Sequence, residues 1–175
     1  MVMYTYEGIT FLKLERGELP LLWKLKQESW ENTHQITINT QEEQENWFNS
    51  LDQHAHSPRN LVLMAHSETA ANFGIFKVFG IDHTNRTADV GWDVFEEYRG
   101  QGLGKRLVKA GSAFCLQMLN LQRLTAEILR TNPASMACAE KAGFVVEGTK
   151  RSAVHKLGVY VDSHVLGLLA SDFTT

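Results

Sequence analysis

A glycine-rich turn between a predicted strand and a predicted helix constrains this chain more than any other feature. Residues 99–104 read Arg-Gly-Gln-Gly-Leu-Gly. The apolar segment 88–95 before the turn is typical of a strand, and residues 103–110 can begin a helix. Because glycines leave backbone N–H groups uncovered at the positive end of a helix, such a turn can bind phosphate or pyrophosphate. The sequence therefore predicts a site for a phosphate-bearing molecule.

The glycine spacing excludes two common phosphate-binding loops. The P-loop pattern, Gly-x-x-x-x-Gly-Lys-Ser/Thr, does not occur in the chain. The dinucleotide fingerprint, Gly-x-Gly-x-x-Gly, also fails because no third glycine follows at the required spacing. The pattern that does fit is Arg/Gln-x-x-Gly-x-Gly/Ala, matched by Arg99, Gly102 and Gly104.

A second landmark lies thirty residues further on, where Asn132 and Pro133 precede a predicted helix that ends in Lys-Ala-Gly-Phe at 141–144. Asn is a good N-cap, Pro suits the first helical position, and Gly143 suits the exit from a helix. A merely well-capped helix would carry the same signals.

The two landmarks together resemble the GNAT superfamily of acyl-CoA N-acyltransferases, over about residues 9–169 and most sharply over 89–148. Within it, the chain is similar to the branch that acetylates ribosomal-protein N-termini. The resemblance implies transfer of an acetyl group from acetyl-CoA to a primary amine, either a protein N-terminus or a small-molecule amine. The alternative is a CoA-binding regulatory or sensor module without catalysis.

The expected fold is an α/β domain of the α+β type that includes all residues from 1 to 175. Its predicted order is β-α-α-β-β-β-α-β-α-β-β. The resemblance implies that these strands form a mixed, mostly antiparallel sheet flanked by helices. Strands are predicted at 9–14, 61–65, 72–79, 88–95, 121–129, 144–150 and 159–169, and a capping box at Thr40 begins a helix that runs to about Gln53. The resemblance implies that the strands at 88–95 and 121–129 splay apart around the pantetheine arm of CoA.

The resemblance also implies which residues hold the cofactor. The turn supplies backbone donors and positive charge to the pyrophosphate, the end of the strand before it pairs with pantetheine, and an Asn binds the pantetheine arm. These residues are Val94, Phe95, Arg99, Gly100, Gln101, Gly102, Leu103, Gly104, Lys105 and Asn132.

Candidates for catalysis are fewer. Glu127, on the strand expected to line the cleft, is the candidate general base, although a strand Glu can also simply face solvent. Many family members carry a Tyr acid at the position of Ala139. In its absence Ser135, one helical turn earlier on the same face, is the candidate donor to the departing thiolate. Cys138 is expected to be a core residue.

The acceptor site should be formed by the first two helices and the last hairpin. Trp30, His34 and Tyr160 are candidate acceptor contacts, with packing in the core as the alternative for the two aromatic residues.

The composition and net charge of the chain limit the classes of partner that it is expected to bind. A net charge of −3 over 175 residues gives no basic surface for nucleic acid, and no apolar run approaches the roughly 20 residues of a membrane span. The seven histidines, among them His54 and His56, have no metal-binding spacing, so no metal is expected. Two cysteines, in predicted helices, favour a cytoplasmic protein with reduced thiols. A homodimer is left open.

Overall fold

The computed structural model describes residues 4–34, 40–51 and 57–174. The last residues of the predicted second helix, 52–53, and the two histidines at 54 and 56 lie outside these ranges.

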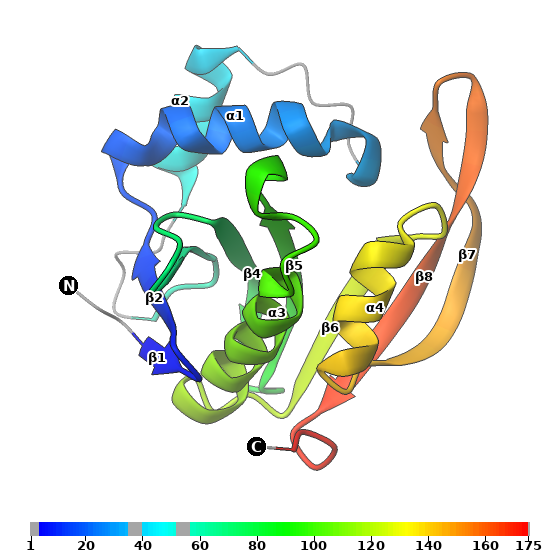
Figure 1. Cartoon of the computed structure of the whole chain (residues 1–175). Coiled ribbons are helices and arrows are strands. Elements are labelled where there is room, and N and C mark those ends of the chain that lie inside the picture. Colours follow the sequence, from blue (N-terminus) through cyan, green and yellow to red (C-terminus); the bar gives the residue numbers. More distant parts are fainter. Residues whose placement is uncertain (1–3, 35–39, 52–56, 175) are drawn as a thin grey trace.

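One eight-stranded sheet runs through the molecule in the order β1-β2-β3-β4-β5-β6-β8-β7 (Figure 1). Neighbouring strands are antiparallel except β5 and β6, which are parallel, so the predicted mixed, mostly antiparallel sheet is confirmed. The strands are β1 (Tyr4–Tyr6), β2 (Ile9–Lys13), β3 (Leu61–Ser67), β4 (Gly74–Asp82), β5 (Thr87–Val94), β6 (Arg123–Leu129), β7 (Val145–Lys156) and β8 (Val159–Leu169).

The predicted order was wrong at the start of the chain, because β1 precedes the first predicted strand. Only three residues form β1, and they are joined to β2 by a two-residue turn in which Glu7 and Gly8 have φ values of 45° and 75°. Positive φ at both turn positions is typical of tight hairpins. In the sequence, Gly8 was the one feature that could have indicated this turn.

In the described ranges, four α-helices cover both faces of the sheet (Figure 1). They are α1 (Leu19–Ser29), α2 (Gln41–Ser50), α3 (Leu103–Ala113) and α4 (Pro133–Lys141). The predicted caps are confirmed: the Thr40 hydroxyl accepts from the Glu43 N–H at 3.1 Å, and Asn132 Oδ1 accepts from the Ser135 N–H at 3.0 Å. Gly143 ends α4 with φ 97°. Among the helices of the described ranges, none is long and apolar enough to cross a membrane.

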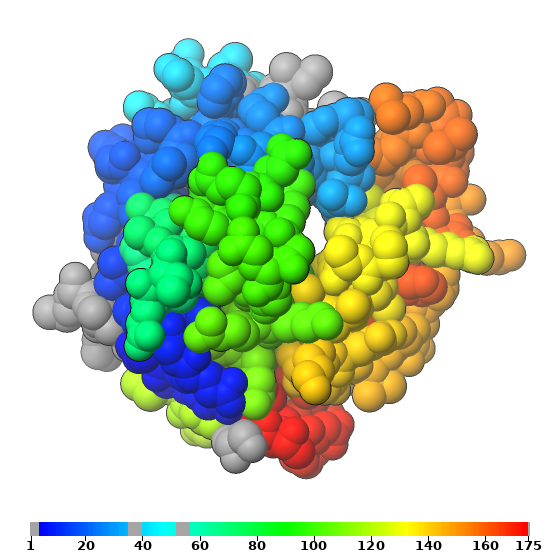
Figure 2. All heavy atoms as spheres, in the orientation of Figure 1, coloured from blue at the N-terminus to red at the C-terminus, as the bar shows by residue number. Residues whose placement is uncertain are grey.

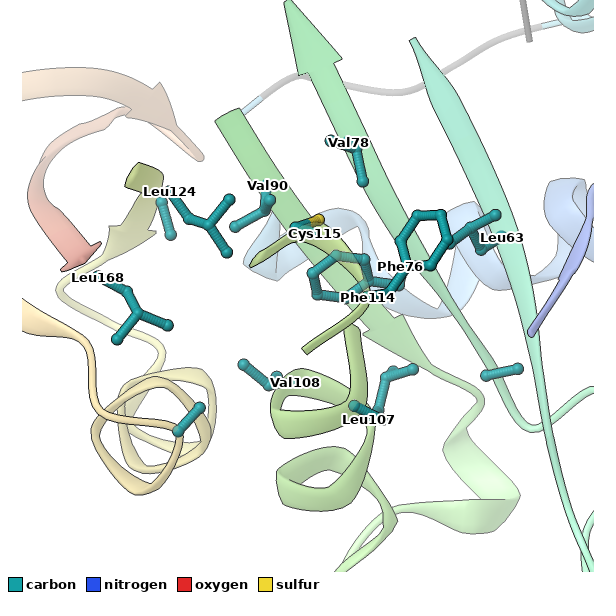
Figure 3. Packing of buried hydrophobic residues seen from close by; sticks show 14 of the residues in the cluster. Leu63, Phe76, Val78, Val90, Leu107, Val108, Phe114, Cys115, Leu124 and Leu168 are labelled. Atoms are coloured by element: carbon teal, nitrogen blue, oxygen red, sulfur yellow. The ribbon is translucent and has the colours of Figure 1, made fainter. Parts of the chain in front are cut away.

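The central strands are buried on both sides, which explains their continuous apolar sequences. Along β3, Leu61 and Leu63 face the core under α3 and α4, whereas Val62 and Met64 face the core under α1 and α2. This alternation follows from the two-residue period of a strand. Figure 3 shows the larger core, where side chains of β4 and β5 meet those of α3 and of the π-helical turn Phe114–Met118 that continues it.

The sheet opens between β5 and β6. Their ladder contains three residue pairs, from Thr87 with Arg123 to Asp89 with Thr125, and ends there. β5 continues to Val94 alongside β4, and β6 continues to Leu129 alongside β8. The predicted splay of these two strands is therefore present, and it leaves one edge of each strand without a partner strand.

The contact between α3 and β4 yields a stability prediction. A methyl group on Gly111 would lie 2.3 Å from the ring of Phe76, which is fully buried and cannot move aside. We expect Gly111→Ala to destabilise the fold, because an overpacking cost of about 1–3 kcal/mol exceeds the roughly 1 kcal/mol gained in helix propensity.

Urea unfolding measures this difference, with Gly17→Ala as the control, since an added methyl there meets no atom within 4 Å. Equal unfolding free energies for the two variants would contradict the packing argument.

Candidate active site

A continuous cleft enters the molecule where β5 and β6 separate. Figure 2 shows its opening between the end of α1, the segment after β5 and α4. Two adjoining cavities, of about 390 Å³ and about 470 Å³, share the wall residues Ser29, Asn32, Trp92, Asp93, Asn132 and Ser135. The first, here called the acceptor cavity, lies between α1, α2, β4, β5 and β6. The second, here called the cofactor cavity, leads to the glycine-rich turn.

The turn has the geometry of a phosphate cradle. Gly100 and Gly102 have φ values of 76° and 79°, which strain any residue with a side chain, and a methyl group on either would meet no atom within 4 Å. Gly104 is needed for a different reason: an added Cβ would lie 3.1 Å from Cys138 Sγ on α4. The glycines therefore leave open space before the turn and bring α3 close to α4.

The start of α3 supplies donors to this space. Gly102 caps the helix without a side-chain hydrogen bond, so the first N–H groups of α3 have no side-chain partner at the cap. Lys105 adds a positive charge at the wall of the cofactor cavity. Open space, helical N–H groups and an ammonium together fit the pyrophosphate of acetyl-CoA.

Several predicted cofactor residues line this cavity, and others do not. Those on its wall are Val94, Arg99, Gly100, Gly102, Gly104, Lys105 and Asn132. Gln101 is exposed and donates to the Glu97 carbonyl at 2.8 Å, and the Leu103 side chain is buried in the core.

Two of the predicted cofactor roles need correction. The Phe95 N–H donates to the Phe73 carbonyl at 3.0 Å, and its ring is buried under α1, so it faces away from the cleft. The Arg99 side chain does not point to the turn: its Nε donates to the Val94 carbonyl at 3.0 Å and its Nη2 to Ser29 Oγ at 3.1 Å. Arg99 thus ties the end of α1 to the end of β5.

The face of α4 toward the cleft carries Ser135 and Cys138. Ser135 borders both cavities. Cys138 packs against the core, as expected, and it also lines the cofactor cavity. Burial raises the pKa of the Cys138 thiol, while Lys105 opposes this rise. Ala139 is fully buried in the core. The position at which many family members carry a Tyr is therefore closed to the cleft in this chain.

Glu127 lies on the wall of the acceptor cavity, as predicted, and it is not alone there. Its Oε1 accepts from Lys150 of β7, and its Oε2 lies 3.9 Å from His34 Nε2. The same His34 nitrogen is 2.8 Å from Ser163 Oγ of β8. Burial lowers the pKa of His34 despite the opposing effect of Glu127, and so favours the neutral imidazole. The last hairpin thus contributes through Lys150 and Ser163.

The second carboxylate of the acceptor cavity is also paired. Asp93 Oδ2 accepts from Lys77 Nζ at 2.7 Å. Lys26 lines the same cavity, with its Nζ 4.9 Å from the centre of the Trp47 ring. Sequence reasoning missed both lysines, because nothing in their local sequence distinguishes them from solvated surface lysines.

The aromatic acceptor candidates lie elsewhere. Tyr160 is 70% exposed near the tip of the β7–β8 hairpin, where it packs on His155. Trp30 packs under Lys156, whose ammonium donates to the Trp30 carbonyl. Neither lines the cavities described above, whereas His34 does. Within the described ranges, no group of three or more His, Cys, Asp or Glu side chains could hold a metal ion.

Comparison with known proteins places the chain in a family. Residues 9–145 match the acetyltransferase (GNAT) domain. The chain is 33% identical over 87 residues to the probable N-acetyltransferase YjcK of Bacillus subtilis, covering 50% of this chain and 48% of that protein. It is 31% identical over 99 residues to spermidine N(1)-acetyltransferase of Escherichia coli K12, covering 55% and 52%. The match thus spans about half the length of these curated relatives.

Solved structures agree in fold. Spermidine N-acetyltransferase of Vibrio cholerae, in complex with CoA and spermine, superposes with a TM-score of 0.86 at 21% identity, covering 95% of this chain and 98% of that one. An identity this low shows the fold alone. The family match extends over most of the chain, and it includes both the glycine-rich turn and the cleft. The chain belongs to the GNAT acetyltransferase domain family.

Proposed function

We propose that this protein transfers an acetyl group from acetyl-CoA to the primary amine of a small molecule. The observation that carries the proposal is the junction of the two cavities at Asp93, Asn132 and Ser135. A thioester that extends from the turn through the cofactor cavity reaches the acceptor cavity at this junction. The names of the relatives, which include polyamine acetyltransferases, support a small-molecule acceptor. The ribosomal-protein branch suggested by the sequence stays a prediction.

Different residues of the cleft bind the cofactor, accept the proton of the amine and stabilise the leaving thiolate. The turn and α3 hold the pyrophosphate, and the unpaired edge of β5 with Asn132 orients the pantetheine arm. The amine nitrogen attacks the thioester carbonyl carbon, the C–S bond breaks, and the CoA thiolate leaves. Glu127 accepts the proton that the amine loses. The thiolate takes a proton from solvent or a hydrogen bond from Ser135, since a thiol with a pKa near 8.5 is a good leaving group.

Release of free CoA thiol from acetyl-CoA, measured with amino acids, amino sugars, polyamines and short peptides, tests the proposal. Turnover with a small amine is expected, whereas turnover with peptides alone would favour a protein N-terminus as acceptor. The buried Ala139 favours one other function, a CoA sensor without catalysis. Acetyl-CoA binding without thiol release from any amine, together with turnover by Ala139→Tyr, would establish the sensor.

Gly102→Val should weaken acetyl-CoA binding by roughly 10- to 100-fold, the range for one hydrogen bond to a charged group, because valine blocks the approach of the pyrophosphate to the backbone. Calorimetry measures the affinity. Gly80→Val is the matched control, because Gly80 has a similar φ of 60° and open surroundings outside the cleft. Equal acetyl-CoA affinity in the two variants would refute the cradle.

Glu127→Gln should lower kcat at neutral pH by about 10²–10⁴-fold, the usual contribution of a general base, with little change in KM. The deficit should shrink as pH rises, because more of the amine is then deprotonated without help. A pH profile of kcat measures both effects. Glu147→Gln is the control, since Glu147 pairs with Arg123 outside both cavities. A loss independent of pH would assign Glu127 to structure alone.

Ser135→Ala should slow turnover by no more than roughly tenfold, the equivalent of one hydrogen bond of about 0.5–1.5 kcal/mol. The serine is one of several possible proton sources for the thiolate, so its loss is partly replaced by solvent. Steady-state kcat measures the change. A decrease of a thousandfold would instead make Ser135 the essential acid.

A further inference from the structure

The acceptor cavity has an unusual charge balance for a site that binds amines. Its charged wall residues are Lys26, Lys77, His34, Asp93 and Glu127. Burial favours the neutral form of His34 by lowering its pKa, and the remaining charges are two ammonium groups and two carboxylates. An amine arrives largely as a cation, so a site selective for a purely cationic acceptor would need carboxylates that are free to bind it.

Neither carboxylate is free. Lys77 Nζ lies 2.7 Å from Asp93 Oδ2, and Lys150 of β7 donates to Glu127. A polycation would have to displace one of these lysines to reach a carboxylate. Lys156 adds further positive charge nearby, since Lys150, Lys156 and Lys77 all act to lower the pKa of His34.

Of the two lysines that line the acceptor cavity, Lys77 is paired with Asp93, and Lys26 is the other. No carboxylate of the described ranges lies within ion-pair distance of its ammonium, which rests over the Trp47 ring. Burial lowers the pKa of Lys26, and repulsion by Lys77 lowers it further. Asp93, which is bound to Lys77, opposes this lowering only in part. Residues 35–39, which follow His34 in the chain, read Gln-Ile-Thr-Ile-Asn and contain no ionisable side chain.

We propose that the acceptor is a small zwitterionic amine, whose carboxylate or phosphate binds Lys26 while its amine faces Glu127. The inference rests on the proposed function and names its substrate class. A hydrogen-bonded ion pair is strongest where both partners leave water, so an anion in this half-buried cavity gains more from Lys26 than it would at the surface. The cavity volume of about 390 Å³ suits a small molecule.

Matched acceptors test the proposal. The members of each pair differ in the anion: an amino acid against its amide, and ethanolamine phosphate against ethanolamine, with spermidine as the polycation. Because the anion also raises the pKa of the neighbouring ammonium, kcat/KM is expressed per concentration of free amine. We expect the anionic member of at least one pair to have the higher kcat/KM, and which pair responds identifies the anion as carboxylate or phosphate. Lys26→Met should raise KM for that acceptor by roughly 10- to 100-fold, the range for a hydrogen bond to a charged group, and thereby remove its preference over the neutral partner.

Lys24→Met is the charge-matched control. Lys24 lies on the same helix, lines neither cavity and pairs with Glu28 and Glu97, so the preference for the anion should be kept. Preference for spermidine or for the neutral partners, or an unchanged preference in Lys26→Met, would overturn the inference while leaving acetyl transfer intact. Preference for peptides over all small amines would overturn it as well.

A binding measurement separates this inference from the proposed function. Calorimetry of the same anionic amines with the CoA-bound wild type and Lys26→Met proteins reports on Lys26 without turnover. If no amine releases thiol but the wild type binds an anionic amine more tightly than Lys26→Met does, the proposed catalysis fails and the anion site stands. Equal binding by the two proteins would refute the anion site.

Discussion

The early end of the β5–β6 ladder is the constraint on which the rest of the site depends. Beyond Asp89 and Thr125 the two parallel strands lose their mutual hydrogen bonds, although each keeps its antiparallel neighbour on the other side. The sheet therefore stays stable while a cleft opens through its middle.

Contacts on each side of the gap hold the ends of the elements that border it. Arg99 joins the carbonyl at the end of β5 to the end of α1, and Asn132 caps α4 on the opposite wall. Gly104 permits the close approach of α3 to α4 that forms the floor of the cofactor cavity. These contacts hold the walls of the two cavities in place.

The cofactor cavity and the acceptor cavity differ in the charged groups on their walls. The cofactor cavity offers helical N–H groups and Lys105, both suited to phosphate. The acceptor cavity pairs each of its carboxylates, Asp93 and Glu127, with a lysine. A free carboxylate would attract any cation. The two lysine–carboxylate pairs of the acceptor cavity, with Lys26 on the same wall, instead favour an acceptor that carries its own negative charge.

Motifs formed by residues close together in the sequence determined the fold and the cofactor side of the site. The glycine-rich turn, the Thr40 and Asn132 caps and the apolar strands depend on residues close in sequence, so each could be recognised from the sequence alone. The tertiary structure alone decided the rest. It tied the Arg99 side chain to the ends of β5 and α1, buried the Phe95 ring under α1 and left Tyr160 exposed. It also paired Lys77 and Lys150 with the carboxylates of the cleft and placed Lys26 on the wall of the acceptor cavity. Side-chain partners of this kind come from elements distant in the chain, and their direction depends on packing that no local pattern encodes.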